Sequence, residues 1–346
     1  MRHEKPEGEL RKGWTTGACA TAAVKAAYTA LLTGAFPNPV VITLPKGEQP
    51  SFPLALAEKG EGFARVGITK DAGDDPDVTH GALIIATVRM GGTGIRFKAG
   101  DGVGTVTKAG LPIGVGEPAI NPVPRQMMIA EIERLGGRDV EIEISIPGGA
   151  EIALKTWNGR LGIVGGLSIL GTTGVVHPFS CAAWIASIHR GIDVARANRL
   201  THVAGCTGST SEDAVRAAYG LPLEAMLDMG DFVGGVLKYL RSHPVARLTI
   251  GGGFGKMVKL AQGEMDLHSG RSQVDFEWLA ERVPEALRPK VLAANTALEV
   301  LQMAGNDLAQ QVAIEALAKA STVVGLAVAV DVMVISREGK VIGHAS

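Results

Sequence analysis

The chain of 346 residues has few aromatic side chains: eight Phe, four Trp and three Tyr, or 4% of the sequence. So few rings cannot form a long base-stacking platform for single-stranded nucleic acid. Net charge is almost absent as well, because 34 Lys and Arg are balanced by 35 Asp and Glu. This balance argues against a nucleic-acid partner held by bulk electrostatics, although it is compatible with a local basic pocket.

Cysteine is also scarce, with only Cys19, Cys181 and Cys206, none of them in a CxxC pair. Their odd number and wide spacing exclude a disulfide scaffold and a thiolate zinc cluster, and we expect no bound metal. The longest apolar run, Val323 to Val330, ends at Asp331 and is far shorter than the ~20 residues of a membrane helix. The polar N-terminal segment does not resemble a signal peptide. We therefore expect a cytoplasmic protein without a membrane partner.

What the sequence does contain is apolar material and glycine. Hydrophobic residues make up 46% of the chain and charged residues 20%, which excludes disordered and fibrous classes and supplies cores for about two domains. The 46 glycines are nearly twice the average share of about 7%. Because no low-complexity tract contains them, they predict many tight turns and close approaches of backbone to ligand.

The first half of the chain predicts a mixed α and β domain over residues 1–158. Thr15-Thr16-Gly17 precedes small and apolar residues that favour a helix ending at Gly34. A second helix is expected at Pro124–Leu135. Short β-branched or alternating segments between Pro, Gly and Asp predict strands at Val40–Leu44, Phe63–Ile68, Ala82–Arg89, Gly94–Lys98 and Val140–Ile146. We place the domain boundary near Trp157–Gly162.

The second half, residues 159–346, predicts an α/β domain with a mostly parallel sheet. Three short apolar runs each lead through a Gly/Thr/Ser loop into a helical stretch: LSIL into GTTG, THVA into GCTGS, and ARLTI into GGGFG. Repeated strand–loop–helix units indicate parallel strands with helices on the sheet faces. Ligands of such sheets bind at the carboxyl ends of the strands, where these loops lie.

None of the glycine loops matches a named nucleotide-binding motif. GGGFGKM fails as a P-loop because Ile250 replaces its first Gly and Met257 its Ser/Thr. MLDMGDFVGG has Asp231 where the usual S-adenosylmethionine loop has its second Gly. Each loop alone is compatible with an ordinary turn, and three in one domain favour a ligand site.

Two polar clusters allow alternative interpretations. The segment Lys70–Ala82 holds Asp71, Asp74, Asp75, Asp77 and His80, without EF-hand spacing. It is either a solvated turn or the polar lining of a substrate cleft.

Lys256, Lys259, His268 and Arg271 form the second cluster, as a wet helix face or as an anion pocket. In the first turn of a helix, Lys256 would oppose the helix dipole by roughly 0.3–1 kcal/mol, so its removal is expected to stabilise the fold.

Five segments together resemble one family. RKGWTTGACATAA, KDAGDDPDVTHGA, LSILGTTGVVHPFS, MGDFVG and GGFGKMVKLAQG followed by HS occur in this order and are similar to the CbiD family of cobalamin-biosynthesis proteins. The resemblance runs from about Leu10 to Ser269 and, more weakly, to the C-terminus. The chain departs from the family pattern at Ser180-Cys181-Ala182, where the family usually has an acidic pair, and at Met265–Leu267.

The resemblance implies methyl transfer from S-adenosylmethionine to carbon 1 of cobalt-precorrin-5B, which gives cobalt-precorrin-6A. It also implies an N-terminal α+β domain of the ribosomal S5 domain-2 type and a Rossmann-like C-terminal domain. The small-molecule partner would be a corrinoid precursor whose carboxylates suit Lys, Arg and loop N–H groups. A homo-oligomer is compatible with these features. No side chain is singled out as catalytic, because such a transfer depends on orientation in a dry site.

On this basis we expect two sets of binding residues. The methyl donor is expected in the second domain at Gly171, Thr172, Thr173, Gly174, Gly205, Thr207, Gly208, Ser209, Gly230 and Asp231. The substrate is expected at Thr15, Thr16, Gly17, Asp71, Asp74, Asp75, His80, Lys256, Lys259 and His268. Two other classes stay open: a nucleotide-dependent small-molecule kinase that uses Lys256 as a phosphate ligand, and a non-enzymatic tetrapyrrole carrier.

Overall fold

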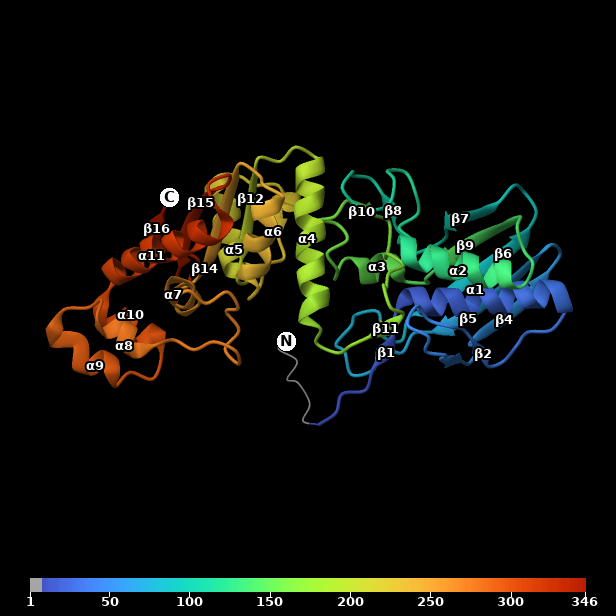
Figure 1. Ribbon diagram of the computed structural model, residues 1–346, viewed down its shortest axis with the longest axis horizontal. Helices are drawn as coiled ribbons and strands as arrows, with labels where there is room; N and C mark the ends of the chain where they lie inside the picture. The colour runs from blue at the N-terminus through green and yellow to red at the C-terminus, as the bar shows by residue number, and fades with distance from the viewer. Residues whose placement is uncertain (1–7) are drawn as a thin grey trace. The chain divides into compact units, whose positions relative to one another are not determined.

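The computed structural model describes residues 8–346 as a mixed α/β protein, which confirms the predicted fold class. The chain divides into two compact units, one up to Ser180 and one from Cys181 to Ser346 (Figure 1). Among the described residues, no helix combines the length and the apolar character needed to cross a membrane.

The first unit is built on a five-stranded sheet in the order β4-β5-β6-β9-β7. Its strands are β4 (Leu56–Gly60), β5 (Phe63–Thr69), β6 (Leu83–Met90), β7 (Ile95–Ala99) and β9 (Val140–Ser145). All neighbours are antiparallel except β7 and β9. In β9 the apolar Val140, Ile142 and Ile144 are buried, and Glu141 and Glu143 on the other face are half-buried. This alternation is the one predicted from the sequence.

Two helices, α1 (Thr16–Thr33) and α2 (Pro122–Arg134), pack together on this unit (Figure 1). Helix α1 carries small or apolar side chains on nearly all of its faces, and most of its residues are fully buried. Such a composition is typical of a helix enclosed by protein. It ends as predicted at Gly34, whose φ of 83° is readily adopted only by glycine.

Short strand pairs complete the first unit and determine where it ends. β1 (Gly13–Trp14) pairs with β11 (Val175–Val176), and β8 (Thr105–Val106) pairs with β10 (Ile163–Val164). The remaining elements are β2 (Val40–Val41), β3 (Ser51–Phe52) and α3 (Gly149–Ala153). Because β10 and β11 belong to the first unit, the boundary after Ser180 lies later than the expected boundary after residue 158.

The second unit contains a sheet in the order β13-β12-β14-β15-β16. Its strands are β12 (His202–Cys206), β13 (Met226–Leu227), β14 (Arg247–Gly253), β15 (Ala329–Ile335) and β16 (Val341–Ala345). All are parallel except β16, which agrees with the predicted mostly parallel sheet.

Helices cover both faces of this sheet. Helix α5 (Ser209–Tyr219) packs on one face, where Val215 contacts a small core around Cys206 and Met333. The larger core includes buried side chains of α4 (Cys181–Ala197), α6 (Val233–Ser242), α7 (Phe254–Gln262) and α11 (Asn306–Val324). Short helices α8 (Phe276–Ala280), α9 (Arg288–Leu292) and α10 (Ala297–Ala304) and the 3-10 turns Leu223–Ala225 and Glu285–Leu287 complete the unit.

The prediction of three strand–loop–helix motifs was wrong for one of them, the motif that begins with LSIL. Leu167 and Ile169 make isolated bridges to Val103 and Ile120 of the first unit, so LSIL is not a strand of the parallel sheet. The sequence analysis missed β13 and α6, which form the third such unit beside β12–α5 and β14–α7.

Candidate functional site

The carboxyl ends of the parallel strands surround a cavity of about 290 Å³ in the second unit. It is lined by Thr207, Gly208, Ser209, Thr210, Ser211, Gly253, Ile335, Ser336 and Arg337. Three of the predicted donor-binding residues, Thr207, Gly208 and Ser209, are therefore together at the sheet edge where ligands of such folds bind. The sequence analysis missed Arg337, which follows β15 and brings a cation to the same cavity.

The first residues of α5, Ser209, Thr210 and Ser211, line this cavity. The first N–H groups of a helix have no acceptor within the helix, and the helix dipole favours an anion beside them. Gly208 precedes α5 in an extended conformation, and a Cβ built there would meet no atom within 4 Å. Together with Arg337, the edge suits a small ligand with a carboxylate or another anionic group.

Gly205 has a different role from the one expected. It lies inside β12 and is buried. A Cβ at this position would come within 2.8 Å of the sulfur of Met229. The absence of a side chain therefore allows β12 to pack against the turn after β13.

A second cluster joins the turn after β13 to α7. Lys256 Nζ donates to Asp231 Oδ1 at 2.6 Å and to the carbonyl of Leu267 at 2.8 Å. Lys259 Nζ donates to the same carbonyl at 3.2 Å. Burial lowers the pKa of Lys259, and the nearby charge of Lys256 lowers it further. The two lysines therefore share one helix face, as predicted from their spacing.

This arrangement changes the interpretation of the expected anion pocket. The anion beside Lys256 is the protein's own Asp231, and Lys259 is only 5% exposed. His268 is exposed, and its Nδ1 accepts a hydrogen bond from the N–H of Gly270. Asp231 was expected to bind the donor and Lys256 the substrate, so the structure pairs residues from the two predicted sets. Direct binding of a substrate carboxylate by Lys256 stays a prediction.

In the first unit, the hydrogen bonds of Thr15, Thr16 and Gly17 connect the start of α1 to the GTTG segment and the residue before it. Thr15 Oγ1 accepts from the N–H of Ala18 at 3.1 Å and is the N-cap of α1. Thr16 Oγ1 accepts from the N–H of Leu170 at 3.0 Å, and the N–H of Gly17 donates to the Leu170 carbonyl at 2.9 Å. Both threonines are buried. Their hydroxyl groups therefore have protein partners, and substrate binding by these residues stays a prediction.

The GTTG segment itself is not at the edge of the parallel sheet. Gly171, Thr172, Thr173 and Gly174 belong to the first unit, so their expected place in the second domain was wrong. The N–H of Thr15 donates to the Gly174 carbonyl at 3.0 Å. A Cβ on Gly171 would lie 2.3 Å from Thr15 Oγ1. The segment thus needs glycine for its close packing on the start of α1.

The acidic loop Lys70–Ala82 is braced by hydrogen bonds. Asp71 pairs with the guanidinium of Arg11, which lowers the pKa of this carboxyl to about 2. Asp74 accepts from the N–H of Arg11 at 2.6 Å, and Asp75 from the N–H of Phe179 at 2.8 Å. His80 Nδ1 accepts from the N–H of Ala72 at 3.1 Å. The N–H of Trp14 donates to the Asp71 carbonyl at 2.7 Å, so the loop lies beside Thr15 as expected.

These carboxylates do not gather as metal ligands. Over residues 8–346, no group of three or more His, Cys, Asp or Glu side chains is arranged to hold a metal ion. The polar atoms of this loop fix its conformation and its attachment to Arg11.

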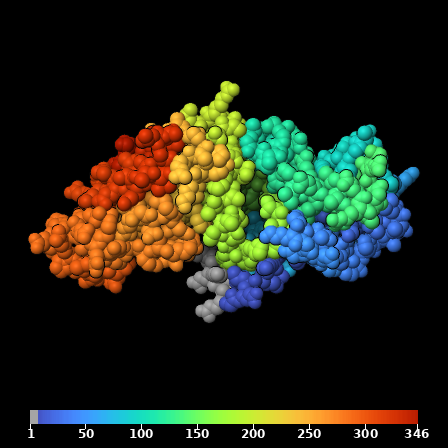
Figure 2. Space-filling view, viewed as in Figure 1, coloured from blue at the N-terminus to red at the C-terminus, as the bar shows by residue number. Residues whose placement is uncertain are grey.

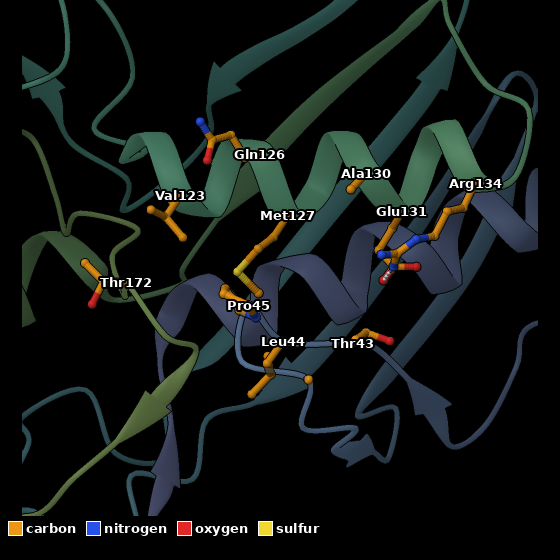
Figure 3. Close-up of a pocket in the computed structure, with 11 residues that line it drawn as sticks. Thr43, Leu44, Pro45, Val123, Gln126, Met127, Ala130, Glu131, Arg134 and Thr172 are labelled. Carbon is orange, nitrogen blue, oxygen red and sulfur yellow. Dashed lines mark hydrogen bonds and ion pairs between the residues drawn. The ribbon is translucent and has the colours of Figure 1, made fainter.

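A cavity of about 510 Å³ forms a groove in the first unit that sequence reasoning missed (Figure 3). One face of α2 supplies Val123, Gln126, Met127, Ala130, Glu131 and Arg134, and the other side is formed by Thr43, Leu44, Pro45, Gly47 and Thr172. The available signal was the helical spacing of these α2 residues. Glu131 is 1% exposed, and its carboxylate lies 2.8 Å from Arg134 and 3.0 Å from Lys25. The groove is therefore apolar in its middle and charged at one end.

Comparison with known proteins gives a consistent result. The chain matches the family model CbiD over residues 3–178 and the model CbiD, C-terminal domain, over residues 266–346. It is 62% identical to a protein of Paramagnetospirillum magneticum named cobalt-precorrin-5B C(1)-methyltransferase, over 98% of this chain and 99% of that protein. A protein of Brucella anthropi with the same name is also 62% identical, over 98% of this chain and 96% of that protein.

The chain belongs to the CbiD family. This confirms the resemblance carried by the five sequence segments. A solved structure of the cobalamin biosynthesis protein CbiD from Archaeoglobus fulgidus is 29% identical, with a TM-score of 0.41, over 77% of this chain and 84% of that one.

The first CbiD match ends close to the division of the chain, whereas the second covers only the C-terminal part of the second unit. The first match ends at residue 178, two residues before the last residue of the first unit. The second begins at residue 266 and includes His268 and β15. The GCTGS loop, Asp231 and Lys256 lie between the two matched ranges, so their roles in this CbiD protein are argued from geometry.

Proposed function

We propose that this CbiD protein transfers a methyl group from S-adenosylmethionine to carbon 1 of cobalt-precorrin-5B, which gives cobalt-precorrin-6A. The observation that carries the proposal is the 62% identity, over 98% of this chain, to a protein named for that reaction. Identity that extends through both units supports the whole activity rather than the presence of one domain.

For the methyl donor, we propose the cavity at the edge of the second unit's sheet. S-adenosylmethionine carries an amino-acid carboxylate, which the N–H groups at the start of α5 and Arg337 would bind. Gly208 supports this proposal because its open backbone allows a ligand to approach closely. Asp231 and Gly230 would contribute only indirectly, because they belong to the turn that binds Lys256.

The reaction itself requires positioning. An electron-rich carbon attacks the methyl carbon, a new carbon–carbon bond forms, the carbon–sulfur bond breaks and the thioether leaves with that electron pair. The protein would align the two reactants and exclude water, which supplies much of the rate gain in such transfers. Neither a nucleophilic side chain nor a metal is required for this step.

The direct test is incubation of the purified chain with the cobalt-precorrin-5B intermediate and methyl-labelled S-adenosylmethionine, followed by mass analysis of the macrocycle. We expect one labelled methyl group per macrocycle, located on carbon 1. A product without the label, together with magnesium-dependent ATP binding, would favour the kinase. Tight macrocycle binding without affinity for S-adenosylmethionine would favour the carrier.

A further inference from the structure

Trp184 is held rigidly and yet is half exposed. It lies in α4, part of which is visible at the surface in yellow-green (Figure 2). Its Nε1 donates to the carbonyl of Asp228 at 2.8 Å, and its ring centroid lies 5.9 Å from that of Phe232. A Cβ on Gly230 would lie 3.2 Å from Cζ2 of Trp184. The turn after β13 therefore fixes the ring, although 45% of the residue remains exposed.

Arg271 continues this row of flat groups. Its guanidinium carbon lies 5.5 Å from the centroid of Phe232. Nε and Nη2 donate to the carboxylate of Asp266, while Nη1 has no hydrogen-bond acceptor within residues 8–346. The Arg271 side chain is 41% exposed. The row thus ends in a guanidinium with donors still available to a second carboxylate.

The other tryptophans do not offer a comparable surface. Trp157 is 37% exposed, but the guanidinium of Arg160 lies 4.1 Å from its ring. Trp278 has Arg282 at 3.4 Å, and Trp14 packs against Phe52. In the described part of the chain, no guanidinium lies over Trp184. An open, immobilised indole face is suited to stacking by a flat ligand, because little conformational entropy is lost on binding.

We propose that the surface formed by Trp184, Phe232 and Arg271 binds the tetrapyrrole substrate. The macrocycle would stack on the indole, and an acetate or propionate group would bind Arg271 Nη1. This assignment rests on the proposed function for its ligand, a flat ring that carries several carboxylates. The surface provides the matching pair of features: a flat apolar ring and, two ring contacts away, a cation with free donors.

The ligand for the test is cobyrinic acid, a corrin with free carboxylates that needs no methyl donor to bind. Its dissociation constant is measured by calorimetry for wild type, Trp184→Ala, Trp184→Phe and Arg271→Gln. We expect Trp184→Ala to weaken binding at least tenfold and Trp184→Phe to stay within about threefold of wild type, because stacking depends on an aromatic face. Arg271→Gln should weaken binding and reduce its salt dependence.

Trp157→Ala is the matched control, since it removes another partly exposed indole and should leave corrin affinity unchanged. Thermal melts of each variant confirm folding, and Trp184→Phe serves as the informative variant if Trp184→Ala does not fold. Wild-type affinity in Trp184→Ala, or an equal loss in Trp157→Ala, would overturn the assignment. Unchanged corrin affinity of Trp184→Ala together with a changed sedimentation coefficient would also overturn the assignment. That result would make this surface an interface between copies of the chain.

The two proposals can fail separately. Indole-dependent corrin binding without methyl transfer by the wild type would contradict the methyltransferase proposal and leave the binding surface. Methyl transfer by Trp184→Ala with wild-type kcat/KM for the macrocycle would contradict the binding surface alone.

Discussion

Lys256 Nζ and Asp231 Oδ1 lie 2.6 Å apart and join two segments that are 25 positions apart in the chain. The same ammonium group donates to the Leu267 carbonyl, and the N–H of Leu267 donates to the carbonyl of Asp231. These hydrogen bonds join three segments, MGDFVG, GKMVKLAQG and the stretch before His268, into one local structure.

We predict that Lys256→Met destabilises the fold by about 1–3 kcal/mol, because it leaves a half-buried carboxylate and a carbonyl without this partner. This sign is opposite to the one expected from the helix dipole alone. Urea unfolding measures the change. Asp231→Asn and the double variant complete a mutant cycle, in which the coupling energy isolates the pair. A more stable Lys256→Met would show that the dipole term dominates.

We predict that Gly208→Val weakens binding of S-adenosylmethionine at least tenfold and leaves the melting temperature nearly unchanged. The extended backbone accepts any residue, and the Cβ position is empty. A branched side chain would occupy the space where a ligand meets the helix start. Calorimetry measures the affinity. Gly205→Ala is the control for packing, since its methyl group would contact Met229 and lower stability. Full affinity in Gly208→Val would remove this loop from the donor site.

Thr16→Ala is expected to lower stability by roughly 0.5–1.5 kcal/mol, because the hydrogen bond from the N–H of Leu170 to the hydroxyl of the buried Thr16 is lost. The Michaelis constant for the macrocycle should stay at the wild-type value, since the hydroxyl has a protein partner. Thr16→Ser, which keeps the hydroxyl, should behave nearly like wild type. A raised Michaelis constant with unchanged stability would restore the substrate-binding interpretation.

Asp331 is 1% exposed and accepts from Arg247 Nε at 2.8 Å and from the Tyr219 hydroxyl at 2.7 Å. Thr249 Oγ1 also lies within 3.0 Å of both its oxygens. We predict that Asp331→Asn costs about 1.5–3 kcal/mol of folding free energy, because its donors lose a charged acceptor while Arg247, whose side chain is 39% exposed, stays hydrated. Tyr219→Phe, which removes one donor, should cost about 1 kcal/mol. Equal losses in the two variants, measured by urea unfolding, would contradict this ranking.

His202 makes stability depend on pH. Burial lowers its pKa below the ordinary value of 6.5, and the charge of Arg247 lowers it further, against the opposing effect of Asp331. Below pH 6.5 the unfolded chain therefore binds a proton that the folded chain does not, so the free energy of unfolding falls as pH drops toward the folded pKa. His202→Gln should reduce this loss between about pH 7 and pH 5. The same slope in wild type and variant would show that His202 does not contribute.

The parts of the fold predicted from sequence are those fixed by local pattern. The alternation at Val140–Ile146, the apolar stretch before Gly34 and the runs that lead into GCTGS and GGGFG each identified an element correctly. LSIL was misassigned because a short apolar run carries no information about its partner, here Val103 and Ile120.

The sites were harder to predict because their residues meet only through tertiary packing. The pairing of Asp231 with Lys256 and the row from Trp184 to Arg271 join segments from separate elements. For the acidic loop the sequence left open a solvated turn and a cleft lining, and in the structure its carboxylates bind Arg11 and backbone N–H groups.

The pairing of Gly13–Trp14 with Val175–Val176 makes the first and last strands of the first unit neighbours. A fragment cut at residue 158 would lose that partner strand as well as β10, and would expose the start of α1. Because the two ends of the unit meet, a short linker from 176 to 13 would allow circular permutation. New termini in the exposed turn Gly91–Gly94 would leave every paired strand intact.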